Sequence, residues 1–345
     1  MSKNYSIYFF KIISTLFVVG IHSFVFYSVD VNIYTILMAL FSIAVPFFFI
    51  ASGYLMYISL NKRKNSKEQQ IYLLKYLLNL LSVYIIYTLI DGLLIYMENY
   101  YILNTKVDIL RWIFSKETLL GLHIGGYFYS IWFLMTLIHS HLIIYYLKSK
   151  IELVVCFSSL IYICLYSLQA TGIIGVSRNV FTVGLLFTSL GYLIAKYKEI
   201  ILNYFKNKNN NLLILINLLF FIWLVIEVKL IYLNLNMTLT SYLILIPLII
   251  INFIILLKNP NKLKNNKIEF LGRNTFGVYL LHSFILRLIY LLFNYYNIPQ
   301  HFISNIFVFI IFIIMVYIIS YFLYYTPIYI VKKIKNKLNF KKKLS

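Results

Sequence analysis

The sequence contains little charge, and most of the charge it has is of one sign. Only 12% of its 345 residues are Asp, Glu, Lys or Arg, and only 10 residues are acidic. A soluble globular protein carries about twice that share of charged residues. Because 62% of the residues are hydrophobic, the chain is also too apolar for a disordered basic tail. Cysteine is scarce as well: Cys156 and Cys164 lie in one apolar run, which excludes a disulfide framework.

The motifs of soluble enzymes are missing too. The sequence has no phosphate-binding glycine loop, no HExxH, no GxSxG and no paired cysteines at metal-binding spacing, each of which would point to a defined chemistry. We therefore predict no metal site. The composition leaves two broad classes open, a membrane transporter and an enzyme embedded in a membrane.

Long apolar runs are what the sequence does contain. A run of about 17–25 residues is long enough to cross the ~30 Å hydrocarbon core of a bilayer as a helix. Ten such runs are present, and they predict an all-α, polytopic integral membrane helix bundle with spans at about 6–28, 33–60, 71–97, 126–147, 152–169, 179–197, 211–233, 238–257, 275–295 and 302–331.

The distribution of basic residues predicts how these spans are oriented. The formal net charge is +21, which in a soluble protein would suggest nucleic acid as a partner. If the N-terminus is cytoplasmic, 24 of the 31 basic residues fall on the cytoplasmic side and five outside, as the positive-inside rule requires. The charge therefore predicts a multi-pass protein of the plasma membrane with both termini in the cytoplasm, and no nucleic-acid partner. We expect a single membrane domain over 1–335 and a basic cytoplasmic tail over 336–345.

Two ionisable residues share the first predicted span. Lys11 and His22 are 11 residues apart, which is about three helical turns and ~16 Å of rise, so both project from nearly the same helix face. Ionisable groups inside spans are costly and mark candidate functional sites. The alternatives stay open at this point: Lys11 can extend to the inner headgroups, and His22 can form an interhelical hydrogen bond.

Other polar residues in the predicted spans have several interpretations. His282 lies about as deep in the ninth span as His22 does in the first, which suggests one shared cavity. Arg178 begins the sixth span, where an arginine is usually an interfacial anchor. For the small residues of the second span we expect close helix packing, and for the remaining charged and histidine side chains we expect pairing among themselves. The small residues are Ala51, Ser52 and Gly53. The remaining charged and histidine residues are Asp91, Glu227, His139, His141 and Arg287.

Several of these stretches, taken in order, resemble the acyltransferase-3 family of integral membrane acyltransferases, which O-acylate sugars and other hydroxyl acceptors. The stretches are 10–23 (FKIISTLFVVGIHS), 45–54 (VPFFFIASGY), 129–134 (YSIWFL), 178–192 (RNVFTVGLLFTSLGY) and 270–282 (FLGRNTFGVYLLH). The resemblance implies a ten-helix domain over essentially the whole chain. The opening stretch is also similar to the membrane part of the serine racemases of glycopeptide-resistance systems.

The chain departs from the family pattern at three positions. Lys11 stands where the family has Arg, Tyr8 where an Asp is common, and Ser130 where the aromatic element has His. A lysine keeps the positive charge but loses the planar fork with which arginine binds phosphate or carboxylate.

The resemblance implies a site and a reaction. A hydroxyl is a weak nucleophile that needs a base, so we predict His22 as the general base and Lys11 as the group that binds or polarises the donor. Arg178, His282, Trp132 and Ser130 are predicted substrate-binding residues. The donor would be acetyl-CoA or another acyl-CoA acting as co-substrate on the cytoplasmic side, with no bound cofactor. The acceptor would be a hydroxyl of a surface or lipid-linked glycan. The alternative function is a transporter or sensor of a small polar solute, such as an amino acid or another acid.

Overall fold

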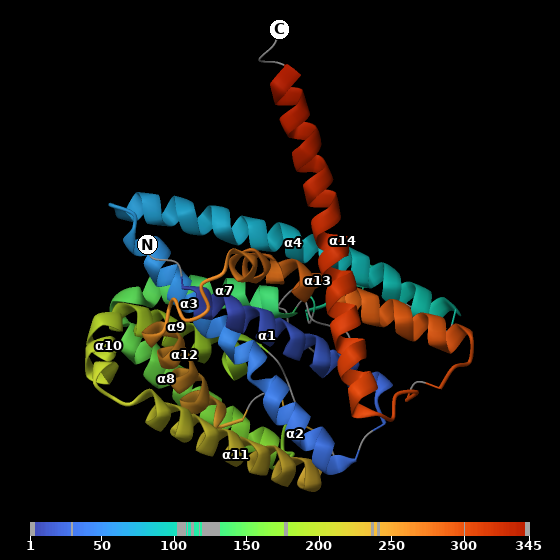
Figure 1. Cartoon of the computed structure of the whole chain (residues 1–345), viewed down its shortest axis with the longest axis horizontal. Coiled ribbons are helices and arrows are strands. Elements are labelled where there is room, and N and C mark those ends of the chain that lie inside the picture. The colour runs from blue at the N-terminus through green and yellow to red at the C-terminus, as the bar shows by residue number, and fades with distance from the viewer. Residues whose placement is uncertain are drawn as a thin grey trace.

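The structure is a computed structural model that describes residues 4–28, 30–101, 108, 110–111, 114–116, 118, 132–175, 179–235, 238–239, 242–299 and 301–341. In this part of the chain the regular structure is helical, apart from one isolated parallel β-bridge between Tyr27 and Ile303 (Figure 1). A helix satisfies all of its backbone hydrogen bonds internally, as a chain in lipid requires. The predicted all-α membrane bundle is confirmed.

Twelve α-helices are described, and all but Lys198–Lys206 overlap the predicted apolar runs. They are α1 (Tyr5–Ser23), α2 (Val31–Ser42), α3 (Ala44–Asn61), α4 (Ser66–Tyr101), α7 (Trp132–Leu147), α8 (Ile151–Ala170), α9 (Leu185–Lys196), α10 (Lys198–Lys206), α11 (Asn210–Leu235), α12 (Leu245–Lys258), α13 (Asn266–Tyr295) and α14 (Ile306–Lys341). Side chains fix several of the starts: Asn4, for example, accepts a hydrogen bond from the Ile7 amide at 3.0 Å and caps α1, which satisfies an amide that has no partner within the helix.

The number of spans differs from the ten predicted. Within the described residues, seven helical segments are long and apolar enough to cross a membrane, or eight if the bent pair α9–α10 counts as one span. The predicted fourth and fifth spans fall in one helical stretch, Trp132–Ala170, interrupted only by a 3-10 turn at Lys148–Lys150. The predicted eighth span contains only α12, which has 14 residues.

α12 begins seven residues later than the predicted eighth span, and this late start has a physical cause. The Glu227 carboxylate of α11 accepts hydrogen bonds from the amides of Leu243 and Ile244 at 2.8 and 3.2 Å. The Tyr162 hydroxyl of α8 donates to the carbonyl of Tyr242 at 2.8 Å. These side chains satisfy backbone groups that a longer helix would otherwise satisfy, so the chain can stay non-helical there. Hydropathy alone does not detect such partners.

The predicted second span consists of two helices. α2 ends at Ser42 and α3 begins at Ala44, so the chain breaks within the apolar run. Pro46 lies in the first turn of α3, where the absence of its amide proton costs no helical hydrogen bond. The break leaves Ser42 and Val45 beside the cavity described below.

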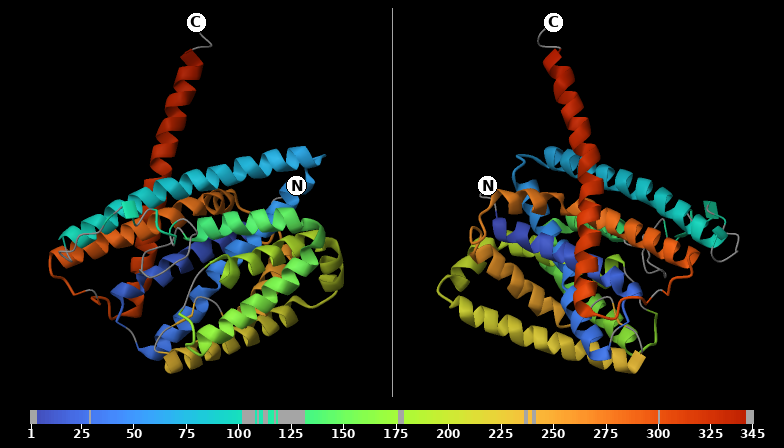
Figure 2. Two further views of the ribbon diagram at one scale, coloured as in Figure 1. Left: turned by 180° about the vertical axis from the view of Figure 1, so that it is seen from behind. Right: turned by 45° about the vertical axis from the view of Figure 1, so that its right-hand side comes forward.

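The helices differ in how much of their surface the protein covers. In the apolar window of the α2–α3 span 61% of the residues are buried, against 17% in α11. Leu218, Leu219 and Trp223 of α11 are each more than half exposed, which is the outward apolar face that a membrane helix presents to lipid. Figure 2 shows α4 and α11 at opposite edges, with α1 and α3 between them, and α14 extending beyond the bundle at its C-terminal end.

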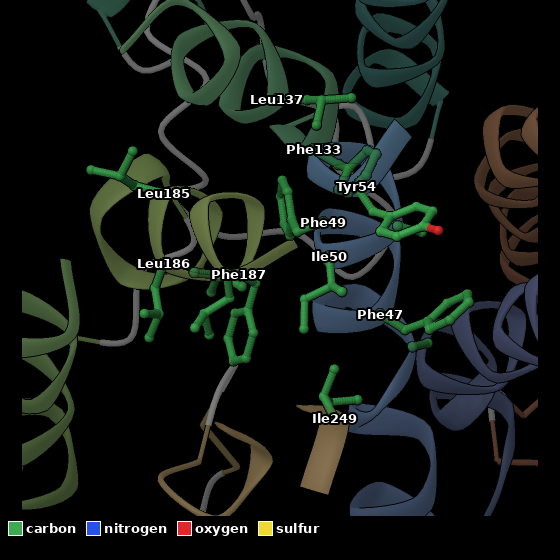
Figure 3. Close-up of a cluster of buried hydrophobic side chains, with 14 of the residues drawn as sticks. Phe47, Phe49, Ile50, Tyr54, Phe133, Leu137, Leu185, Leu186, Phe187 and Ile249 are labelled. Atoms are coloured by element: carbon green, nitrogen blue, oxygen red, sulfur yellow. The ribbon is translucent and has the colours of Figure 1, made fainter. Parts of the chain in front are cut away.

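The central packing contact joins α3 to α9. A Cβ added to Gly53 would lie 1.9 Å from the Thr188 carbonyl oxygen, and one added to Gly191 would lie 2.0 Å from the Ile50 carbonyl oxygen. Only glycine permits this approach of the two backbones, so the predicted packing role holds for Gly53. In Figure 3, Phe49 and Ile50 of α3 point toward α9, which carries Phe187.

Candidate active site

Two buried histidines meet where α1 packs against α13. The ring centroids of His22 and His282 are 5.2 Å apart, and the two residues are 7% and 0% exposed. Nδ1 of His282 donates a hydrogen bond to the Val278 carbonyl at 3.3 Å. Its Nε2 atom has no hydrogen-bond partner among the described residues, and with Nδ1 protonated that atom is an acceptor.

The two helices run in the same direction, which explains why the histidines lie at one depth. A Cβ on Gly272 would lie 2.6 Å from the carbonyl oxygen of Tyr8, so α1 and α13 approach closely there. Further along both helices His22 meets His282. The side chain of Arg273 also lies over the Tyr8 ring, with its guanidinium carbon 5.8 Å from the centroid. Tyr8 therefore contacts α13.

His22 borders a small cavity that contains several polar groups. The volume is about 30 Å³, which is room for about one water molecule or one hydroxyl group. The lining residues come from α1, α2, α3, α7 and α13 and from the segment before α12: Val18, Ile21, His22, Met38, Ser42, Val45, Trp132, Leu239 and Tyr279. Trp132, a predicted substrate-binding residue, thus lies in the same cavity as His22.

Lys11 borders a second and larger cavity of about 290 Å³. Its wall is mostly apolar and is formed by Lys11, Phe48, Ala51, Ser52, Leu55, Tyr76, Leu80, Phe133, Leu137, Thr275, Phe276 and Tyr279. The structure therefore places Lys11 and His22 in two neighbouring cavities along α1.

Three aromatic residues lie at or beside the wall that the two cavities share. Tyr279 borders both of them. Its ring centroid lies 5.1 Å from that of Phe133 and 6.1 Å from that of Phe48, and these two residues border only the Lys11 cavity. The Tyr279 ring is also 5.8 Å from that of His282. We call Phe48, Phe133 and Tyr279 the aromatic partition.

Two predicted site residues have no position to report, because Arg178 and Ser130 lie outside the described residues. The predicted pairing of the intramembrane charges holds in part. Arg287 of α13 is buried, and its guanidinium nitrogens lie 3.8 Å from Asp91 and 3.7 Å from Glu98 of α4. Glu227 instead binds backbone amides, as described above.

One polar contact at the larger cavity was not predicted. Ser52, which the sequence assigned to packing, forms a hydrogen bond with His141 of α7 at 3.2 Å. The two residues are 89 positions apart, so no local pattern connects them. The sequence offers only one hint, a hydroxyl within a run of small residues.

The sequence matches the acyltransferase domain of the acyltransferase-3 family over residues 4–325. No curated protein and no solved structure matches the chain. The family match covers nearly the whole helical bundle, including α1, both histidines, Lys11 and the aromatic partition. The chain is therefore a multi-pass membrane protein that belongs to the acyltransferase-3 family, whose members transfer acyl groups other than aminoacyl groups.

Proposed function

We propose that this acyltransferase moves an acyl group from an acyl-CoA, such as acetyl-CoA, to a hydroxyl of a cell-surface or lipid-linked glycan at the plasma membrane. The observation that carries the proposal is the pair of cavities along α1. Lys11 borders one and His22 the other, and Tyr279 borders both. A cavity for the donor that shares a wall with a small cavity for the acceptor hydroxyl suits a transfer between two different substrates.

In the proposed step His22 is the general base. It takes the proton from the acceptor hydroxyl as the oxygen attacks the thioester carbonyl carbon. The new carbon–oxygen bond forms, the carbon–sulfur bond breaks, and the leaving thiolate receives the proton that His22 took. The charge that develops on the carbonyl oxygen needs a cation or a hydrogen-bond donor, and Lys11 is the cation that borders the donor cavity.

The remaining predicted residues would bind and orient the substrates. His282 contacts His22 through its ring, so it is placed to position the base. Trp132 borders the His22 cavity and offers an indole donor and an apolar face to a sugar. For Arg178 and Ser130 the proposal rests on the family pattern alone.

Acyl groups on surface polysaccharide, measured by NMR, test this function. Cells that carry His22→Ala should lose the O-acyl signal, whereas cells that carry His301→Ala should keep it, because His301 is exposed and does not border either cavity. Unchanged acylation in His22→Ala at equal protein level would remove the catalytic role of His22.

A further inference from the structure

Ser52 and His141 form a polar pair between α3 and α7 that the step above does not use. The Ser52 hydroxyl lies 3.2 Å from Nε2 of His141. Nδ1 of the same ring lies 2.7 Å from the Leu137 carbonyl oxygen. A carbonyl can only accept a hydrogen bond, so Nδ1 carries the proton of the neutral ring and Nε2 is an acceptor. The Ser52 hydroxyl must therefore donate to His141.

This geometry differs from that of other serines in the bundle. Buried helical serines such as Ser23, Ser140 and Ser189 donate to a carbonyl of their own helix. Ser52 donates to a ring nitrogen on another helix. A serine hydroxyl that donates to an imidazole, with the imidazole oriented by a third group, is the arrangement that activates a serine as a nucleophile.

The pair is also placed where a donor would bind. Ser52 borders the Lys11 cavity, together with Tyr76. His141 is 1% exposed and lies behind Ser52, with its ring 5.3 Å from that of Tyr76.

We propose that Ser52 accepts the acyl group from the donor thioester and holds it as an ester, with His141 as the base. This inference rests on the proposed function and adds a covalent intermediate to it. Ser52 Oγ attacks the thioester carbonyl carbon while its proton moves to Nε2 of His141. The carbon–sulfur bond then breaks, and the proton passes from His141 to the leaving thiolate. The products are an O-acyl serine and the free thiol.

A second transfer completes the reaction. The acceptor hydroxyl, deprotonated by His22, attacks the carbonyl carbon of the serine ester. The bond to Ser52 Oγ breaks, and the proton that His22 took from the acceptor returns to the serine oxygen, so that both histidines end neutral. The net reaction is the one proposed above, thioester plus hydroxyl giving ester plus thiol. Because the acyl group waits on Ser52, the thiol leaves before the acceptor binds.

Labelling of the full-length protein without any acceptor tests the intermediate. The purified chain is incubated with acetyl-CoA that carries ¹⁴C in the acetyl group, and protein-bound label is measured after denaturation. We expect label on the wild-type chain, release of free CoA in equal amount, and an acetyl ester on the peptide that contains Ser52. Alkaline hydroxylamine should remove this label, since it cleaves esters and leaves amides intact.

Matched variants separate chemistry from folding. Ser52→Ala and His141→Gln should lose the label. Ser189→Ala and His139→Gln should keep it, since the Ser189 hydroxyl donates to a carbonyl of its own helix and His139 lies two residues from His141 on the same helix. Ser52→Cys should keep a label that neutral hydroxylamine removes, because the acyl group is then a thioester. A purely structural role of Ser52 cannot explain why the label would become sensitive to neutral hydroxylamine.

The result that overturns the proposal is an unlabelled wild-type chain, or equal label on wild type and Ser52→Ala. An experiment that rejects the serine intermediate can be told apart from one that rejects the proposed function. If His22→Ala abolishes glycan acylation while Ser52→Ala does not, the direct transfer stands and the serine intermediate is wrong. If the role of His22 and the serine intermediate are both correct, the His22→Gln protein should retain its acetyl label when acceptor is added. The wild-type chain should then lose its label to the acceptor.

Discussion

Replacement of Gly191 by alanine should disturb the helix contact that holds α3, the helix that carries Ser52 and Phe48. The added Cβ would lie 2.0 Å from the carbonyl oxygen of Ile50, whereas ordinary van der Waals contact begins near 3.4 Å. The obstacle is backbone and not the end of a flexible side chain, so α3 and α9 must separate by about 1.4 Å. Overpacking of this kind costs about 1–3 kcal/mol.

The assay is thermal stability of the detergent-solubilised protein, followed as the fraction that remains monodisperse after heating. At about 2–4 °C per kcal/mol, the expected fall in the midpoint is roughly 2–12 °C. The matched control is Gly175→Ala, because a Cβ at Gly175 meets no atom within 4 Å. If Gly191→Ala were as stable as Gly175→Ala, the close approach of α3 and α9 would be wrong.

Three further substitutions test other parts of the account. Lys11→Arg should keep or raise acyl transfer, because arginine preserves the cation and is the family's residue; a large loss would show a site adapted to lysine. Glu227→Gln should destabilise the protein by about 1–3 kcal/mol through weaker hydrogen bonds to the start of α12, and an unchanged thermal midpoint would contradict that role. Arg287→Leu should destabilise by about 3–5 kcal/mol, because it leaves buried carboxylates unpaired; we expect loss of solubilised protein, and normal yield would refute the buried ion pairs.

The fold class could be predicted from the sequence because each apolar run signals its own helix. The number of spans could not, since it depends on partners distant in the sequence. The carboxylate of Glu227 and the hydroxyl of Tyr162 satisfy the backbone before α12, and no hydropathy window shows that. The break at Ile43 between α2 and α3 likewise lies inside an uninterrupted apolar run.

The candidate site was predictable to a similar degree. His22 and His282 stand out because histidine is rare in an apolar span, and equal depth on two parallel helices brings them into contact. The two separate cavities and the aromatic partition were not predictable, because Phe48, Phe133 and Tyr279 look like ordinary core residues in a chain with 19% aromatic residues. Ser52 and His141 were missed for the same reason: only the packing of α3 against α7 brings them together.

The central claim is that His22 takes the proton from the acceptor, and one measurement tests it most directly. Membrane vesicles that contain the protein and its glycan acceptor are supplied with ¹⁴C-acetyl-CoA, and the initial rate of label transfer to polysaccharide is measured. Loss of a general base lowers a rate by about 10²–10⁴-fold, and we predict a decrease in this range for His22→Gln, with His301→Gln close to wild type. A His22→Gln rate within about twofold of wild type, at equal protein level, would contradict the account.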